Sequence, residues 1–200
     1  MYNPDVHNRQ SIRLRDFDYG DAGAYFVTVC AWRRECLFGD VVDGDVRLNE
    51  LGVLVRDEWL RTPEVRPNVV LDEFVVMPNH FHAILWITDP VGARRAVPGF
   101  DPAVPGPNPA PQNQGTARRA PTVEKFGRPV AGSLATIVRS FKSAATKRIN
   151  ALRNNAGCPV WQRNYYEHVI RGDRDLHAVR QYIADNPAKW ALDTNHPDRI

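Results

Sequence analysis

The sequence predicts an α+β protein, built on an antiparallel sheet with helices mainly on one face. Segments rich in aromatic and β-branched residues come early in the chain, and short connections join them. Helical patterns lie between and after these segments, which is typical of this fold class. At 200 residues, with 43% hydrophobic side chains, the chain is long enough to bury a core. We therefore expect a single domain over residues 1–200.

The first half of the chain contains the strand patterns. Aromatic and β-branched residues dominate three segments, which predicts strands at residues 24–32, 69–77 and 81–88. The last two are separated only by Met-Pro-Asn, so we expect them to form a hairpin. Residues 38–48 contain two glycines and predict a loop or a short hairpin. Residues 49–61 show apolar side chains at helical spacing, with Asn49 as the N-cap.

The second half begins with a change of composition. Nine of the 16 prolines lie between residues 90 and 129, which predicts a flexible insertion at about 90–131 that interrupts the domain. Residues 133–152 place an apolar stripe at helical spacing and form the clearest helix pattern. Residues 160–170 are aromatic, and their pattern leaves the type of element open. Residues 175–184 predict a last helix before Pro187.

Composition excludes several classes of protein. No apolar run approaches the length of a membrane helix, so we expect no contact with a membrane. The polar start of the chain carries no pattern of a secretory signal. The three cysteines, Cys30, Cys36 and Cys158, are odd in number and lack a CxxC spacing, which favours reduced thiols in the cytoplasm.

The charge is unevenly distributed along the chain. Residues 131–171 contain seven basic side chains and one acid, whereas the whole chain carries a net charge of +3. Cations beside aromatic rings suit a phosphate backbone with unstacked bases. The candidate DNA contacts are Arg139, Lys142, Lys147, Arg148, Arg163, Trp161, Gln162, Tyr165 and Tyr166. The alternative for the cations is an ordinary solvated helix face. Trp161 and Gln162 could instead fix their own segment, and Tyr165 and Tyr166 could be packing residues.

The segment VVMPNHFHAILW contains a pair of histidines. His80 and His82 are two residues apart on a predicted strand, so both imidazoles point to the same face. Phe81 and Ala83 would then face the core. Two neutral imidazoles with a third ligand nearby can hold a divalent metal ion. The alternative is a pair of partly buried, hydrogen-bonded histidines.

The His-Phe-His pattern within MPNHFHAILW resembles the motif of the single-tyrosine HUH transposases. Three further segments are similar to one branch, the REP-associated tyrosine transposases: SLATIVRSFKSAATKRIN, VWQRNYYEHVIR and QYIADNPAKW. The resemblance runs from about Arg13 to Trp190, and the proline-rich stretch departs from it. It implies a ferredoxin-like HUH fold, with the histidines on a central strand and a nucleophilic tyrosine on a late helix. It also implies a bacterial, monomeric enzyme that acts on the single-stranded DNA hairpins of palindromic repeats.

Tyr182 and Asn186 lie four residues apart on the last predicted helix and therefore share one face. That face could present a phenol and an amide oxygen to His80 and His82, and the spacing matches the family's nucleophile and amide ligand. We expect Tyr182 as the nucleophile, with His80, His82 and Asn186 as ligands of Mg²⁺ or Mn²⁺. The alternative for Tyr182 is a core tyrosine.

The expected activity is cleavage and rejoining of hairpin DNA through a 5′-phosphotyrosine intermediate. Three alternatives stay open: an autonomous insertion-sequence transposase, a catalytically inactive hairpin-binding protein, and a metal-dependent hydrolase of small phosphoesters. The first belongs to the same chemical class. The second would form no covalent adduct with DNA, and the third would not need the basic and aromatic segment at 131–171.

Overall fold

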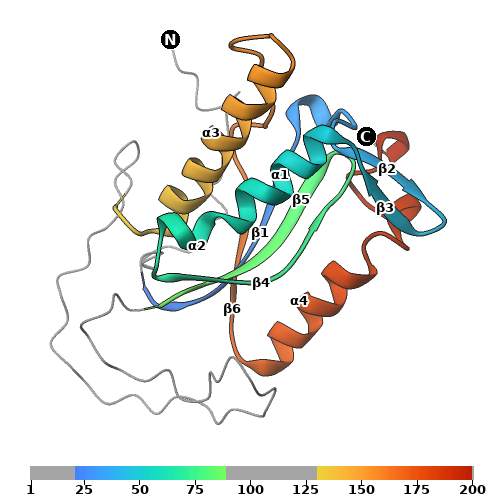
Figure 1. The fold of residues 1–200 in the computed structure, drawn as a ribbon. Coiled ribbons are helices and arrows are strands. Elements are labelled where there is room, and N and C mark those ends of the chain that lie inside the picture. Colours follow the sequence, from blue (N-terminus) through green and yellow to red (C-terminus); the bar gives the residue numbers. More distant parts are fainter. Residues whose placement is uncertain (1–20, 89–129, 200) are drawn as a thin grey trace, which may run out of the picture.

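The computed structural model describes residues 21–88 and 130–199 (Figure 1). The strands are β1 Gly23–Cys30, β2 Gly39–Val42, β3 Asp45–Leu48, β4 Val69–Val76, β5 His80–Ile87 and β6 Tyr166–Ile170. The α-helices are α1 Glu50–Leu60, α2 Thr62–Val65, α3 Leu134–Leu152 and α4 Asp173–Asp185. Short 3₁₀ turns cover Trp32–Arg34, Trp190–Leu192 and Pro197–Arg199. No helix in these ranges combines the length and the hydropathy needed to cross a membrane.

The main sheet has four strands in the order β4-β5-β1-β6, and each neighbouring pair is antiparallel. The predicted α+β class with an antiparallel sheet is therefore confirmed. The segment 38–48 is the β2–β3 hairpin, and the ambiguous segment 160–170 ends in β6. The insertion expected at about 90–131 lies almost entirely outside the described residues, so the single-domain organisation stays a prediction.

One face of the sheet carries most of the core. Helices α1 and α3 lie side by side over this face, whereas α4 lies on the other side of the sheet (Figure 1). Phe81, Ala83 and Leu85 of β5 point into the larger core, which includes the apolar stripe of α3. The opposite face has a smaller cluster, in which Ile183 of α4 packs on Phe26 and its neighbours. The helices therefore lie mainly, but not wholly, on one face.

Local sequence features fix the ends of these elements. Asn49 caps α1, because its side-chain oxygen accepts hydrogen bonds from the backbone N–H groups of Leu51 and Gly52 at 2.9 and 3.0 Å. A side chain at Gly52 would meet the carbonyl oxygen of Phe38 at 2.1 Å, so this position packs the helix directly against the backbone.

Helix α4 is attached to the sheet by a polar contact as well as by its apolar face. Arg180 donates two hydrogen bonds to the carboxylate of Asp72, from Nε at 2.8 Å and from Nη2 at 2.6 Å. Asp72 lies at a β-bulge of the edge strand β4, between Leu71 and Phe74. The bidentate ion pair thus joins the helix that carries Tyr182 to the edge of the sheet.

Candidate active site

The two histidines lie side by side on β5 and face α4. His80 and His82 are 0% and 1% exposed, and their ring centroids are 4.5 Å apart. Alternation along the strand explains the shared direction, because Phe81 between them enters the opposite core. Opposite them on β1, Cys30 pairs with His80 and Thr28 pairs with His82. The expected common face is therefore present.

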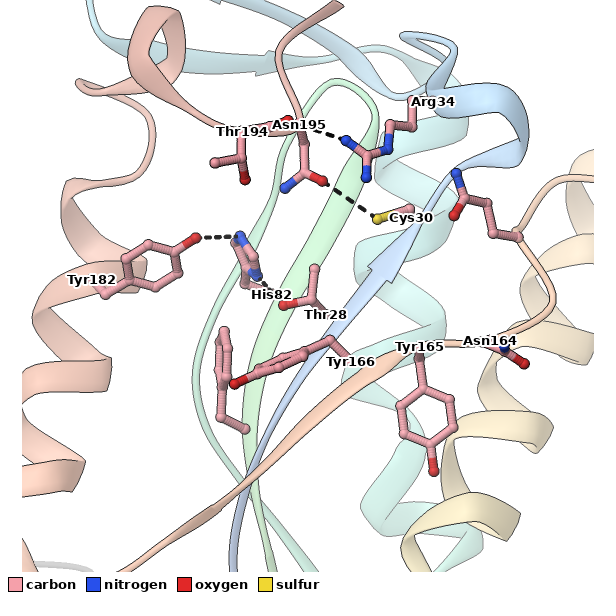
Figure 2. A pocket seen from close by; sticks show the side chains of 12 residues that line it. Thr28, Cys30, Arg34, His82, Asn164, Tyr165, Tyr166, Tyr182, Thr194 and Asn195 are labelled. Carbon is pink, nitrogen blue, oxygen red and sulfur yellow. Dashed lines mark hydrogen bonds between the residues drawn. The ribbon is translucent and has the colours of Figure 1, made fainter. Parts of the chain in front are cut away.

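Tyr182 of α4 reaches the second histidine. Its hydroxyl oxygen lies 3.3 Å from His82 Nε2, and His82 Nδ1 lies 2.8 Å from the hydroxyl of Thr28 (Figure 2). Tyr182 is 46% exposed, so this residue is accessible from solvent. Phe26 stacks on His82 at 5.4 Å and meets Tyr182 edge-on at 6.0 Å. Phe26 therefore packs against both the Tyr182 phenol and the His82 imidazole and keeps them next to each other.

Asn186 is buried at the end of α4, one turn after Tyr182. Its side-chain nitrogen donates to the Oδ2 atom of Asp193 at 3.0 Å. Its side-chain oxygen, like Nε2 of His80, has no hydrogen-bond partner among the described residues. Two buried polar atoms without partners are costly in a folded protein unless something binds them. Their presence here is consistent with a cation site.

Asp193 belongs to this group, although the sequence analysis missed it. One carboxylate oxygen lies 3.8 Å from His80 Nε2, and the side chain is only 4% exposed. Ligand atoms of His80, His82 and Asp193 all lie within 4.8 Å of one another. Asp193 lies in an irregular segment after the Trp190–Leu192 turn, so no helical or strand spacing could have linked it to the histidines.

Burial keeps the histidines in the form that binds metals. It lowers the pKa of His80 to about 4, and the nearby Asp193 carboxylate and Asn186 amide only partly oppose this. Burial, followed by the neighbouring His80, also holds the pKa of His82 well below its ordinary value. Burial and the Asp193 carboxylate raise the pKa of the Tyr182 phenol, which the Asn186 amide partly opposes. Near neutral pH the imidazoles are therefore uncharged and the phenol keeps its proton.

An open pocket of about 560 Å³ lies in front of His82 and Tyr182. Figure 2 shows its walls, which come from β1 and the turn after it, β5, the start of β6 with the segment before it, and α4 with the segment after it. Its lining includes Phe26, Thr28, Cys30, Arg34, Gln162, Asn164, Tyr165, Tyr166, Thr194 and Asn195. Aromatic rings, amides and one guanidinium together suit an unpaired nucleotide.

The predicted DNA contacts have different surroundings. Gln162, Tyr165 and Tyr166 line the pocket. The side chains of Arg139, Lys147 and Arg163 are exposed. Trp161 is 7% exposed and packs against Phe38 and Phe141, so its ring fixes this segment to the core, and a contact with DNA stays a prediction.

Two of the basic side chains predicted to contact DNA bind other groups of the protein. Lys142 Nζ donates to the backbone carbonyls of Gln162, Arg163 and Asn164, at 2.5, 3.2 and 3.3 Å. Arg148 forms an ion pair with the buried Glu58, with Nη1 2.6 Å from Oε1. Lys142 therefore holds the chain segment that forms the pocket wall, and Arg148 joins α3 to α1.

Comparison with known proteins agrees with this fold. No family model matches the chain. An uncharacterized protein of Haemophilus influenzae is 36% identical over 197 residues, which cover 98% of each chain. A solved REP-associated tyrosine transposase bound to a REP hairpin covers 93% of this chain and 77% of its own, with a TM-score of 0.54 and 19% identity. The chain therefore belongs to one family with the Haemophilus influenzae protein, and it has the fold of the REP-associated tyrosine transposase.

Proposed function

We propose that this protein is a metal-dependent single-stranded DNA endonuclease and strand transferase that uses Tyr182 as its nucleophile. The observation that carries the proposal is the position of the Tyr182 hydroxyl, 3.3 Å from Nε2 of a buried histidine pair, in an open pocket. A core tyrosine would not be 46% exposed, as Tyr182 is. The fold shared with a REP-associated tyrosine transposase supports the same reaction class.

The donor set fits a divalent cation. Two neutral imidazoles from His80 and His82 would be joined by the carboxylate of Asp193 and the amide oxygen of Asn186. Oxygen ligands beside imidazole suit Mn²⁺, and Mg²⁺ is the other ion expected for this class. When bound, the ion would draw charge from the scissile phosphate and orient it. The sequence pattern predicted Asn186 alone as the third ligand. Asp193 would add a negatively charged ligand to His80, His82 and Asn186.

The chemical step then belongs to Tyr182. Its phenolic oxygen attacks the phosphorus, a new O–P bond forms, and the P–O3′ bond breaks. The proton lost by the phenol is matched by the one that the departing 3′ oxygen gains. The products are a 5′-phosphotyrosine link and a free 3′-hydroxyl, and the reverse reaction with another 3′-hydroxyl joins a new strand.

Hairpin-forming repeat DNA is the substrate that the site suits best. The solved relative in fold is bound to a REP hairpin. Here the exposed Arg139, Lys147 and Arg163 would contact phosphates, while Tyr165 and Tyr166 line a pocket wide enough for an unpaired nucleotide. We propose that the protein acts as a monomer in the bacterial cytoplasm.

The test is formation of a covalent adduct. Purified protein is mixed with a single-stranded hairpin oligonucleotide and Mn²⁺, and a denaturing gel separates the protein–DNA adduct. Tyr182→Phe should abolish the adduct. Tyr166→Phe should keep it, because this change removes only a hydroxyl and leaves the Tyr166 ring in the pocket, and the hydroxyl 3.3 Å from His82 Nε2 is that of Tyr182.

Each other outcome of this test points to another function. An adduct that persists in Tyr182→Phe would disprove the assignment of the nucleophile. Tight hairpin binding without any adduct in the wild type would favour a DNA-binding protein that lacks catalysis. Hydrolysis of a small phosphoester, without salt-dependent affinity for the hairpin, would favour a hydrolase.

A further inference from the structure

Asn79 precedes the histidine pair, and its side chain contacts two distant segments as well as the neighbouring His80. Its side chain is fully buried, at 0% exposure. The side-chain nitrogen donates to the backbone carbonyl of Arg34 at 3.0 Å and to that of Asn195 at 2.7 Å. The side-chain oxygen lies 2.8 Å from His80 Nδ1. An amide offers two N–H donors and one acceptor oxygen, so these three contacts fix its orientation.

The first consequence concerns His80. Both donors of Asn79 point to carbonyl oxygens, so the atom that faces His80 is an oxygen, which can only accept a hydrogen bond. Nδ1 of the neutral ring must therefore carry the proton. Nε2 then has a free electron pair, and this is the buried atom that faces Asp193 at 3.8 Å.

The second consequence concerns Asp193. The hydrogen bond from Asn79 to the Asn195 carbonyl ties down the segment after α4. In that segment the backbone N–H of Asn195 donates to Asp193 Oδ1 at 2.6 Å. The other oxygen, Oδ2, is thereby left on the side of His80 and Asn186. One buried amide thus acts on two neighbouring ligands.

We propose that Asn79 is a positioning residue that sets both His80 and Asp193 of the cation site. Its oxygen selects the His80 tautomer whose Nε2 is free to bind, and its nitrogen holds the segment that presents the Asp193 carboxylate. The role in cation binding rests on the proposed function. The tautomer and the order of the segment are properties of the metal-free protein, so they can be tested separately.

Nitrogen-15 NMR of the imidazole rings tests the first half of the proposal, without metal. The wild type should show His80 as the Nδ1–H tautomer, and Asn79→Leu should lose that preference. His82, whose Nδ1 contacts Thr28 instead, provides the internal reference. Finding His80 as the Nε2–H tautomer in the wild type, or finding the tautomer unchanged in Asn79→Leu, would overturn this half.

Calorimetric titration with Mn²⁺ tests the effect on the site. Loss of an outer hydrogen bond to a metal ligand commonly costs 10- to 100-fold in affinity, and we expect about that loss for Asn79→Leu. The matched control is Asn150→Leu, which also removes a buried amide that donates to a carbonyl, that of Cys158, but on α3. Equal Mn²⁺ affinity of the two variants would overturn the proposal.

Asn79→Asp separates the two contacts. The carboxylate still accepts from His80 Nδ1 but donates to neither carbonyl, so the His80 tautomer should persist. The backbone amides of residues 193–195 should then exchange with solvent faster than in the wild type, and unchanged exchange would refute the second half. If the wild type itself binds no Mn²⁺, the cation site of the proposed function fails, and the NMR and exchange results still decide the role of Asn79.

Discussion

Acid should destabilise the metal-free protein through His80. Its pKa in the folded protein is about 4, below the ordinary 6.5, because the ring is buried. Between these pH values the unfolded chain therefore binds more protons than the folded one, and the free energy of unfolding falls as the pH falls. The contribution of neutral His80 to the free energy of unfolding is fully present above pH 6.5 and is lost progressively down to about pH 4.

The magnitude follows from the size of the shift. One pKa unit corresponds to about 1.4 kcal/mol, so the depression from 6.5 to about 4 gives roughly 3 kcal/mol. His82 acts in the same direction, because burial also lowers its pKa. Both rings are almost completely buried, so solvent does not screen this effect.

Urea denaturation in EDTA, repeated at several pH values, measures this slope. His80→Gln should flatten the slope between pH 6.5 and 4 relative to the wild type. Ile149→Val is the control, because it lowers stability in the large core without removing a proton-binding group, and its slope should match the wild type. Parallel loss of stability in the wild type and His80→Gln would refute the reasoning.

Four further substitutions test other parts of the structure. Lys142→Met should lower the free energy of unfolding by about 1.5–3 kcal/mol, since it removes a charged donor from three carbonyls, but should keep the salt dependence of hairpin binding. Arg139→Ala should instead reduce the slope of log K for hairpin binding against log salt by about one. Filter binding at several salt concentrations measures this slope for both variants. A reduced slope in Lys142→Met with an unchanged slope in Arg139→Ala would contradict both expectations. Arg180→Met breaks the ion pair with Asp72, so single-turnover cleavage should fall more than hairpin affinity; an equal fall in both would show that the pair does not position α4. Phe81→Ala should cost about 3–5 kcal/mol in a thermal or urea titration, and a loss below about 1 kcal/mol would show that the core closes around the gap.

Periodicity predicted the parts of the site that lie on regular elements. His80 and His82 are two residues apart, which predicted one shared face of a strand. Tyr182 and Asn186 are four residues apart, which predicted one shared face of a helix. That these two faces meet was expected only from the family resemblance, because spacing within an element says nothing about which elements pack together. In the structure this meeting depends on long-range contacts such as that between Tyr182 and His82.

The residues that sequence reasoning missed or misplaced depend on tertiary contacts. Asp193 is held near the histidines by one hydrogen bond from Asn186 at the end of α4 and one from within its own irregular segment, which leaves no periodic signal. Lys142 resembles a solvated cation in a count of charges, but three carbonyl oxygens surround it. Trp161 stands among cations in the sequence, yet its backbone pairs with Ala31 and its ring enters the core. Composition alone could not distinguish these cases.

The unequal faces of the sheet have a consequence for how such a protein evolves. The side covered by α1 and α3 holds the larger apolar cluster, whereas the side covered by α4 combines a small cluster with the histidine pair. Mutations on the first side chiefly change how much folded protein a cell retains. Mutations around the pocket on the second side remove little buried apolar area. Selection can therefore change the residues that line the pocket while the rest of the molecule keeps its shape.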